Sequence, residues 1–293
     1  MNITPNSASS SPSAVDEQWL DKMYNNRALV PNFAQYFSAW QSDSEKARLN
    51  QQAILDVAYG KGTKESLDLF PSKTPHSPVI VFIHGGYWRS LDKADHSFVA
   101  PAFNEMGACV VVPNYDLCPN VTIPQIVMQM VKCLAWVHKN IKHWGGDPRQ
   151  IHVVGHSAGG HLAAMLMACN WSQYNADLPH DLIKNALSIS GLFDLTPLCK
   201  TPFLKDSIRL SDSDAVRCSP AFFPAPSAGK LISVAGGSES AEFIRQNRLI
   251  QEAWGEHRVP ICEELPGQNH FGILSALITP HHRLNELAQS LLD

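Results

Sequence analysis

Residues 151–162 read Ile-His-Val-Val-Gly-His-Ser-Ala-Gly-Gly-His-Leu, and this stretch decides the fold. A short β-branched run enters a Gly-x-Ser-x-Gly turn, and an apolar helical stretch follows directly at 162–168. In such a strand–turn–helix context the side chain of Ser157 stands at the carboxyl end of the strand, and Gly155 and Gly159 carry no β-carbon that would collide there. The stretch predicts a nucleophilic serine. An ordinary glycine-rich turn between a strand and a helix is the alternative.

Strand and helix patterns alternate along the chain on both sides of this turn. Residues 79–83 are apolar without interruption, which is typical of a strand that is covered on both faces of a parallel sheet. The sequence therefore predicts an α/β fold, with helices on both faces of a mostly parallel, doubly wound sheet. The expected strands are 54–59, 66–70, 79–83, 108–113, the run from 151, 185–190, 231–235 and 259–265, and the expected helices include 95–106, 124–141, 162–168 and 241–254.

The chain of 293 residues is long enough for one large domain or two small ones, and we interpret 16–293 as a single domain. Residues 1–15 start with an Asn-, Ser- and Pro-rich stretch that lacks a basic start and an apolar core, so we expect a disordered tail and not a secretion signal. Residues 16–53 predict two or three aromatic-rich helices that fold over the body. Residues 191–228, after the sixth strand, predict a cap-like insertion.

Composition excludes several classes of protein. The net charge is −4 and the basic residues are scattered, so neither nucleic acid nor an anionic membrane would meet a concentrated basic face. No stretch reaches the roughly 18 apolar residues of a membrane span. Seven cysteines without a short paired spacing predict neither a disulfide framework nor a cysteine-type zinc site. We expect a cytoplasmic protein, with a monomer and a homodimer both open.

A serine hydroxyl needs an adjacent base, which a third group orients. His270 fits the base, because it follows the last expected strand at the carboxyl edge of the sheet, where ligands of open α/β sheets bind. We expect the acid in the loop after the penultimate strand, where Glu239 is nearest the strand end. Glu242, in the first turn of the next helix, and Asp194, after an earlier strand, remain alternatives; a capping role is the other explanation for both.

Residues 84–88 read His-Gly-Gly-Tyr-Trp directly after the buried strand 79–83. Glycines at this place let the backbone come close to a ligand with its N–H groups turned inward. We expect the amides of Gly85 and Gly86 to join that of Ala158 in an oxyanion hole.

Aromatic and basic side chains near these motifs are candidates to contact a substrate. Arg27, in a Tyr-Asn-Asn-Arg turn at 24–27, is a candidate to hold an anionic group, and a surface or capping role is the alternative. The candidates to wall an aromatic leaving group are Tyr87, Trp88, Phe193 and Phe271, with Phe222 and Phe223 as further ones, and the hydrophobic core is the alternative place for each.

The motifs at 84–88 and 155–162, the Glu-Ser-Ala-Glu-Phe run at 239–243 and the His-Phe pair at 270–271 together resemble the kynurenine formamidase (arylformamidase) branch of the α/β-hydrolase fold. This branch is close to the hormone-sensitive-lipase-like esterases. The resemblance covers residues 54–293 and implies a triad of Ser157, Glu239 and His270 with no metal or other cofactor. The chain departs from it in having Glu in place of Asp as the acid, and Gln-Asn at 268–269 where Asp is common.

The resemblance implies a serine hydrolase that cleaves an aryl formamide such as N-formylkynurenine through an acyl-enzyme, with kynurenine and formate as products. A short-chain carboxylesterase of broad specificity is the alternative, because both activities would use the same residues. A catalytically inactive binding module would have lost a member of the triad, and none is missing.

Overall fold

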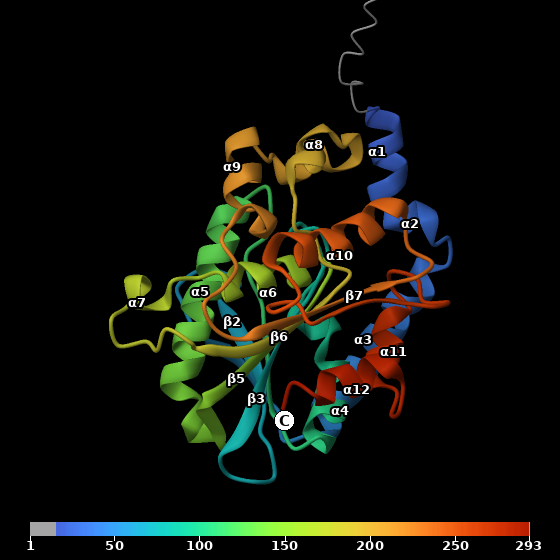
Figure 1. Ribbon diagram of the computed structural model, residues 1–293. Helices are drawn as coiled ribbons and strands as arrows, with labels where there is room; N and C mark the ends of the chain where they lie inside the picture. Colours follow the sequence, from blue (N-terminus) through green and yellow to red (C-terminus); the bar gives the residue numbers. More distant parts are fainter. Residues whose placement is uncertain (1–15, 293) are drawn as a thin grey trace, which may run out of the picture.

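The computed structural model describes residues 16–292, and an eight-stranded sheet runs through it (Figure 1). The predicted tail at 1–15 lies outside the described residues. The strand order is β1-β2-β4-β3-β5-β6-β7-β8; β1 pairs antiparallel with β2 and β2 with β4, and all other pairs are parallel. This confirms the mostly parallel α/β sheet. The strands are β1 (Ile54–Ala58), β2 (Ser66–Phe70), β3 (Ser77–Ile83), β4 (Cys109–Pro113), β5 (Gly146–His156), β6 (Ile183–Ile189), β7 (Lys230–Gly236) and β8 (Ile261–Leu265).

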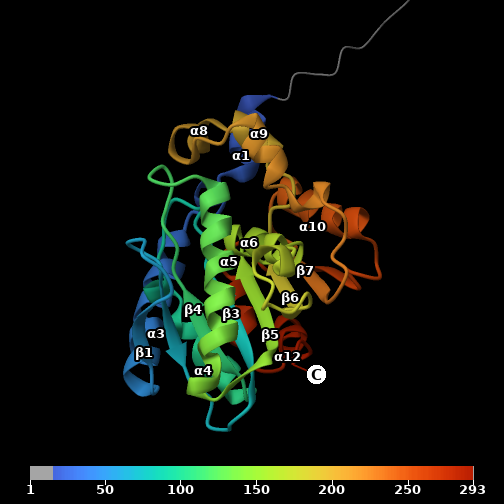
Figure 2. The ribbon, with the colours of Figure 1, turned by 90° about the vertical axis from the view of Figure 1, so that its left-hand side faces the viewer.

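Helices cover both faces of the sheet (Figure 2). Side chains alternate along a strand, so Val81 of β3 belongs to one hydrophobic core and its neighbour Phe82 to the other. Both side chains are fully buried, as expected for a parallel strand with helices on either side. The first core contains α5 (Ile123–Asn140), α6 (Ala158–Met167) and α10 (Ala241–Trp254); the second contains α3 (Phe33–Asn50), α4 (Ala100–Glu105), α11 (Ile273–Ile278) and α12 (Arg283–Gln289).

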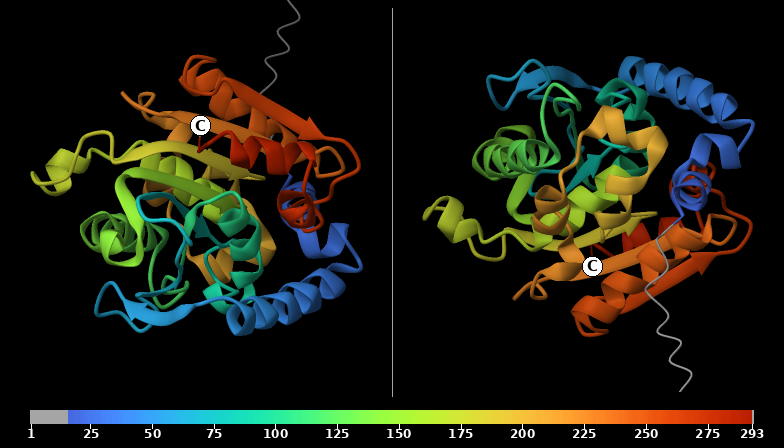
Figure 3. Two further views of the ribbon diagram at one scale, coloured as in Figure 1. Left: turned by 90° about the horizontal axis from the view of Figure 1, so that it is seen from below. Right: turned by 90° about the horizontal axis from the view of Figure 1, so that it is seen from above.

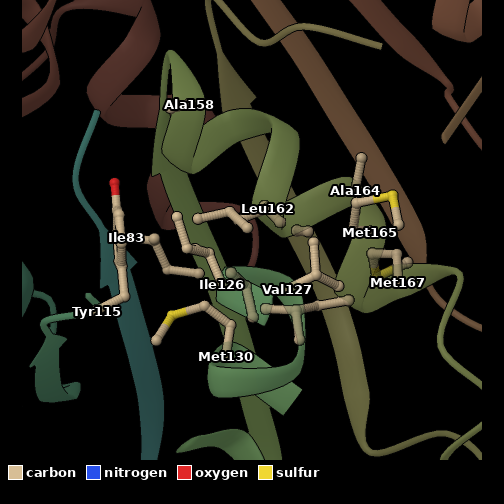
Figure 4. Packing of buried hydrophobic residues seen from close by; sticks show 14 of the residues in the cluster. Ile83, Tyr115, Ile126, Val127, Met130, Ala158, Leu162, Ala164, Met165 and Met167 are labelled. Carbon is tan, nitrogen blue, oxygen red and sulfur yellow. The ribbon is translucent and has the colours of Figure 1, made fainter. Parts of the chain in front are cut away.

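Helix α6, which begins directly after Ser157, is buried along its whole length. It packs against α5, and Figure 4 shows side chains from both helices in this packing, among them Leu162 of α6 and Ile126 and Met130 of α5. A helix enclosed on all sides cannot shift without disturbing a close-packed core. Ser157 therefore stands on a rigid base.

Two segments lie beyond the carboxyl ends of the parallel strands (Figures 1 and 3). The first holds α1 (Glu17–Tyr24) and α2 (Asn26–Leu29), which precede α3, so the described residues 16–53 contain three helices. The second is the insertion at 191–228, with η4 (Thr196–Lys200), α8 (Pro202–Ile208), α9 (Asp212–Arg217) and η5 (Pro220–Phe222). Asp21 of α1 accepts a hydrogen bond of 2.8 Å from the Phe203 amide of α8. The two segments thus contact each other above the sheet.

The predicted helix at 95–106 is shorter than expected. Two 3₁₀ turns, η1 (Lys93–Asp95) and η2 (Ser97–Val99), precede α4. Pro101 lies in the first turn of α4, where its missing N–H costs nothing, whereas an earlier helix start would place it in a helix interior. The remaining described helical elements are η3 (Ile141–Trp144) and α7 (Trp171–Tyr174). Across residues 16–292, no helix combines the length and the apolar character that a membrane crossing requires.

Candidate active site

Ser157 occupies a sharp turn between β5 and α6. Its backbone has φ 57° and ψ −117°, a region that a residue with a side chain rarely adopts. A β-carbon at Gly155 would lie 2.1 Å from the Gly159 carbonyl oxygen, and one at Gly159 would lie 2.0 Å from that of Ile83. Both glycines are therefore required for the chain to turn here, and a strained backbone of this kind is a common feature of functional sites.

The loop between β8 and α11 brings an imidazole to this serine. His270 Nε2 lies 3.1 Å from Ser157 Oγ, and His270 Nδ1 lies 2.6 Å from Glu239 Oε2. The side chain of Asn269 shapes the loop, because its Oδ1 accepts hydrogen bonds from the amides of Phe271 (3.0 Å) and Gly272 (2.8 Å). An amide oxygen therefore fills the place where the family resemblance suggests an aspartate.

Glu239 is fixed on the side of His270 that faces away from the serine. Its carboxylate is fully buried, and Oε1 accepts hydrogen bonds from the Gly236 amide (2.7 Å) and from Ser190 Oγ (2.5 Å). The longer arm of glutamate is accommodated because the carboxylate reaches back to the end of β7 and sideways to the residue that follows β6. The structure thus brings Ser157, His270 and Glu239 into one hydrogen-bonded chain.

The two alternative acids have other partners. Glu242 accepts two hydrogen bonds from Arg245 (2.9 and 2.8 Å) and one from Tyr24 Oη (2.5 Å). Burial disfavours the charge of Glu242, but the bonds from Arg245 and Tyr24 outweigh it and lower the pKa of that carboxyl. Asp194 accepts hydrogen bonds from the amide and hydroxyl of Thr196. Asp194 therefore stabilises the turn before η4 (Thr196–Lys200) and does not contact His270.

The predicted oxyanion donors lie beside Ser157. Within residues 16–292, the amides of Gly86 and Ala158 donate no hydrogen bond to another protein group, so both are free to bind a ligand. A β-carbon at Gly85 would lie 3.0 Å from that of Ser157, so the loop after β3 approaches the serine as closely as a glycine allows. Ala158 also begins α6, whose N-terminus favours negative charge.

A pocket opens over Ser157 and His270. Its wall includes side chains from the N-terminal helices, from the loop after β3, from the insertion and from the loop after β8. The N-terminal helices and the insertion therefore build much of the pocket, although both lie far in sequence from the serine. The aromatic members of the wall are Phe37, Trp40, Tyr87, Phe203 and Phe271.

Of the four aromatic residues predicted to contact substrate, Tyr87 and Phe271 line the pocket, whereas the prediction for Trp88 and Phe193 is wrong. Trp88 and Phe193 are both 0% exposed and belong to the core. The Trp88 ring meets His161 edge to face, with 5.0 Å between ring centroids. Tyr87 and Trp88 adopt positive φ in succession, and their rings lie edge to face with 6.3 Å between the ring centroids.

The two further aromatic candidates also lie away from the pocket. Phe222 is 49% exposed, and Phe223 lines a separate hollow beside Trp171. In their place the structure adds Phe37 and Trp40 of α3 and Phe203 of α8. The many aromatic residues in 33–40 indicate that this helix packs against the body of the protein, but the sequence does not indicate which part it contacts.

His156, the residue before the serine, contacts the candidate base through its backbone. His156 Nε2 lies 2.8 Å from the carbonyl oxygen of His270, and the ring is buried. Burial, and then the neighbouring His270, lower the pKa of His156 well below its ordinary value, so the ring is neutral and donates from Nε2. His156 therefore holds the main chain of His270 in place, a role that the sequence did not reveal.

Other buried histidines make the stability of the fold depend on pH. Burial lowers the pKa of His96 to about 3 and those of His152 and His161 to about 4. Below the ordinary histidine pKa of about 6.5 the unfolded chain binds more protons than the folded chain. The free energy of unfolding should thus be highest above about pH 7 and fall toward pH 4, by up to about 1.4 kcal/mol per histidine per pH unit.

Urea unfolding at several pH values between about 7.5 and 4.5 measures this slope. His161→Leu should make the slope shallower, because the variant has one buried imidazole fewer, whereas His143→Gln at an exposed position should leave it as in the wild type. An unfolding free energy that does not change over this range would contradict the prediction.

The chain is similar to several known proteins. The family model BD-FAE matches residues 67–202. The chain is 31% identical to a kynurenine formamidase of Danio rerio over 86% of each chain, and 29% identical to one of Salmo salar over 92% of this chain and 91% of that one.

Solved structures show the same fold. A Silicibacter protein provisionally assigned as a thioesterase superposes with a TM-score of 0.82 at 29% identity, covering 93% of this chain and 98% of the other. An esterase of Pyrobaculum calidifontis, at 18% identity and a TM-score of 0.67 over 94% and 96% of the two chains, shares the fold alone. On the extent of its identity to the Danio rerio protein, the chain belongs to the kynurenine formamidase family of α/β-hydrolases.

Proposed function

We propose that this protein is a serine hydrolase that cleaves an aryl formamide such as N-formylkynurenine, with kynurenine and formate as products. The observation that carries the proposal is the hydrogen-bonded chain from Ser157 Oγ through His270 to the buried carboxylate of Glu239. The kynurenine formamidases of Danio rerio and Salmo salar support the same activity, because their sequences match this chain over most of its length.

In the proposed reaction His270 Nε2 takes the proton of Ser157 Oγ while this oxygen attacks the formyl carbon. The negative charge that develops on the formyl oxygen is held by the free amides of Gly86 and Ala158, together with Gly85. His270 then gives the proton to the leaving arylamine nitrogen, and Glu239 keeps the Nδ1–H side of the ring oriented throughout. Water, activated by the same imidazole, hydrolyses the formyl-serine ester to formate.

The pocket suits an aromatic leaving group. Tyr87 and Phe271, which border it near Ser157 and His270, offer flat apolar surfaces to an aryl ring. A formyl group adds only a hydrogen atom to the carbonyl carbon, so it needs almost no acyl pocket. An arylamine also leaves more readily than an alkylamine, which makes an aryl amide the easier amide substrate.

A short-chain carboxylesterase is the second candidate, because the same serine, histidine and oxyanion donors would cleave an ester and esterases share the fold. Comparing kcat/KM for N-formylkynurenine with kcat/KM for short p-nitrophenyl esters decides between them. The proposed function predicts faster turnover of the formamide than of the esters. Turnover of N-formylkynurenine no faster than that of the esters would favour the carboxylesterase.

Glu239→Gln should lower kcat by about 10³- to 10⁴-fold, since an amide in the place of the acid can stabilise the wrong tautomer of the histidine. Asp194→Asn and Glu242→Gln are the matched controls, because each changes one of the alternative acids by the same one-atom substitution. Steady-state kinetics on N-formylkynurenine and a p-nitrophenyl ester measures the three variants. If Asp194→Asn were the most damaging of them, Glu239 would not be the acid.

We further propose that residues 16–293 act as a single domain on a small-molecule amide or ester. A cytoplasmic location stays a prediction from the sequence, and a monomer and a homodimer both stay open.

A further inference from the structure

Two arginines line the pocket that contains Ser157 and His270, and the proposed reaction uses neither of them. Arg27 lies in α2, and its guanidinium lies 5.6 Å from the centre of the Phe33 ring and 5.4 Å from that of Phe37. In residues 16–292, the Arg27 guanidinium has no carboxylate oxygen within 4.0 Å. Arg27 therefore brings a positive charge to the pocket without a protein counter-ion.

Arg89, in the loop after β3, is held from one side by the insertion. Its Nη1 donates to the Phe203 carbonyl oxygen (2.8 Å) and to Ser207 Oγ (2.5 Å), and the guanidinium lies 5.2 Å from the centre of the Phe203 ring. In the described part of the chain, Arg89 too has no carboxylate oxygen within 4.0 Å. Its position is thus fixed by neutral groups, which leave its charge uncompensated.

The two guanidiniums are close enough to affect each other. Burial, followed by the repulsion of Arg27, lowers the pKa of Arg89. None of the described residues that line the pocket is an aspartate or a glutamate. Asn26 lines the same pocket and is 4% exposed, and its Nδ2 has no hydrogen-bond partner in residues 16–292. Arg27 is exposed and Arg89 is half-buried. An anion in the pocket would pair with these like charges and would accept a hydrogen bond from the unpartnered Asn26 amide.

We propose that Arg27 and Arg89 form an anion subsite, which binds a carboxylate on the leaving-group part of the substrate. This inference rests on the proposed function, which fixes the orientation of the substrate in the pocket. The formyl group ends at Ser157, so only the arylamine part of the substrate extends along the pocket toward the arginines. A guanidinium pairs with a carboxylate through two parallel hydrogen bonds, and a partly enclosed pocket strengthens such pairs. The subsite would select amino-acid-like aryl formamides over neutral ones.

Binding to the inactive Ser157→Ala protein tests the subsite without depending on turnover. The charged ligand is 4-(2-formamidophenyl)-4-oxobutanoate, which carries the carboxylate of N-formylkynurenine without its ammonium group, and the neutral ligand is its methyl ester. We expect calorimetry to show the carboxylate bound about tenfold or more tightly than the ester. Adding Arg27→Gln or Arg89→Gln should bring the ratio of the two affinities close to one, and higher salt should narrow it in the parent protein.

Arg149→Gln is the matched control, because Arg149 is exposed at the start of β5, away from the pocket; it should leave the ratio unchanged. Arg89→Lys keeps the charge and should retain part of the preference, and Arg27→Gln alone decides if Arg89→Gln fails to fold. Equal affinity for the two ligands, binding of neither, or a ratio that survives in both glutamine variants would overturn the subsite. If wild-type protein cleaves no aryl formamide, the proposed function fails, while the binding ratio still judges the subsite.

Discussion

Ser157→Ala is expected to lower kcat/KM for N-formylkynurenine by about 10⁵-fold or more, leaving only what the oxyanion donors and substrate binding contribute. The reason is that Ser157 Oγ is the atom within hydrogen-bond distance of the imidazole, 3.1 Å from His270 Nε2. Removing it removes the covalent route itself. The fold should survive, because the turn depends on the glycines around the serine, and within residues 16–292 the Ser157 hydroxyl is hydrogen-bonded to His270 alone.

Labelling with a fluorophosphonate probe tests the reactivity of Ser157 Oγ independently of any substrate. Wild-type protein should form one serine adduct, and Ser157→Ala should form none. Ser172→Ala, at an exposed serine after α6, is the control and should label like the wild type. An adduct that persists in Ser157→Ala would move the nucleophile elsewhere, and a wild type that never labels would exclude an activated serine.

His270→Ala is expected to abolish turnover to a similar extent, about 10⁵-fold, because the proposed reaction uses this ring both to take the serine proton and to give it to the leaving amine. Fluorophosphonate labelling should slow in parallel, since the hydroxyl would no longer be activated. Steady-state kinetics and the labelling rate together separate this loss of activation from a loss of substrate binding, which would change only the kinetics.

His156 provides the comparison for this variant. It is the imidazole nearest the base, with 4.9 Å between the two ring centroids, but its Nε2 is engaged with the His270 carbonyl oxygen. His156→Gln should therefore cost much less activity than His270→Ala. If the two losses were equal, or if His270→Ala kept substantial activity, His270 would not be the base of the reaction.

Much of the fold follows from local patterns in the sequence. The uninterrupted run at 79–83 predicted a strand buried on both faces, and β3 has helices on both sides. The Gly-x-Ser-x-Gly spacing predicted the turn at Ser157. The clash that a β-carbon at Gly155 would make arises within the turn itself, whereas the clash at Gly159 is with Ile83 of the neighbouring strand β3. The predicted helix at 95–106 was too long, because α4 begins at Ala100, where Pro101 falls in the first turn of the helix.

The sequence by itself determined which residues have the chemistry and in what order they follow the strands, because strand ends of a parallel sheet meet at one edge. Only the tertiary structure decided which neighbour a side chain meets. It placed Glu239 and not Glu242 against His270, turned Trp88 into the core while Tyr87 faces the pocket, and brought Arg27 and Arg89, 62 positions apart in sequence, into one pocket. Such pairings depend on how loops from distant segments pack together, and no periodicity along the chain encodes that packing.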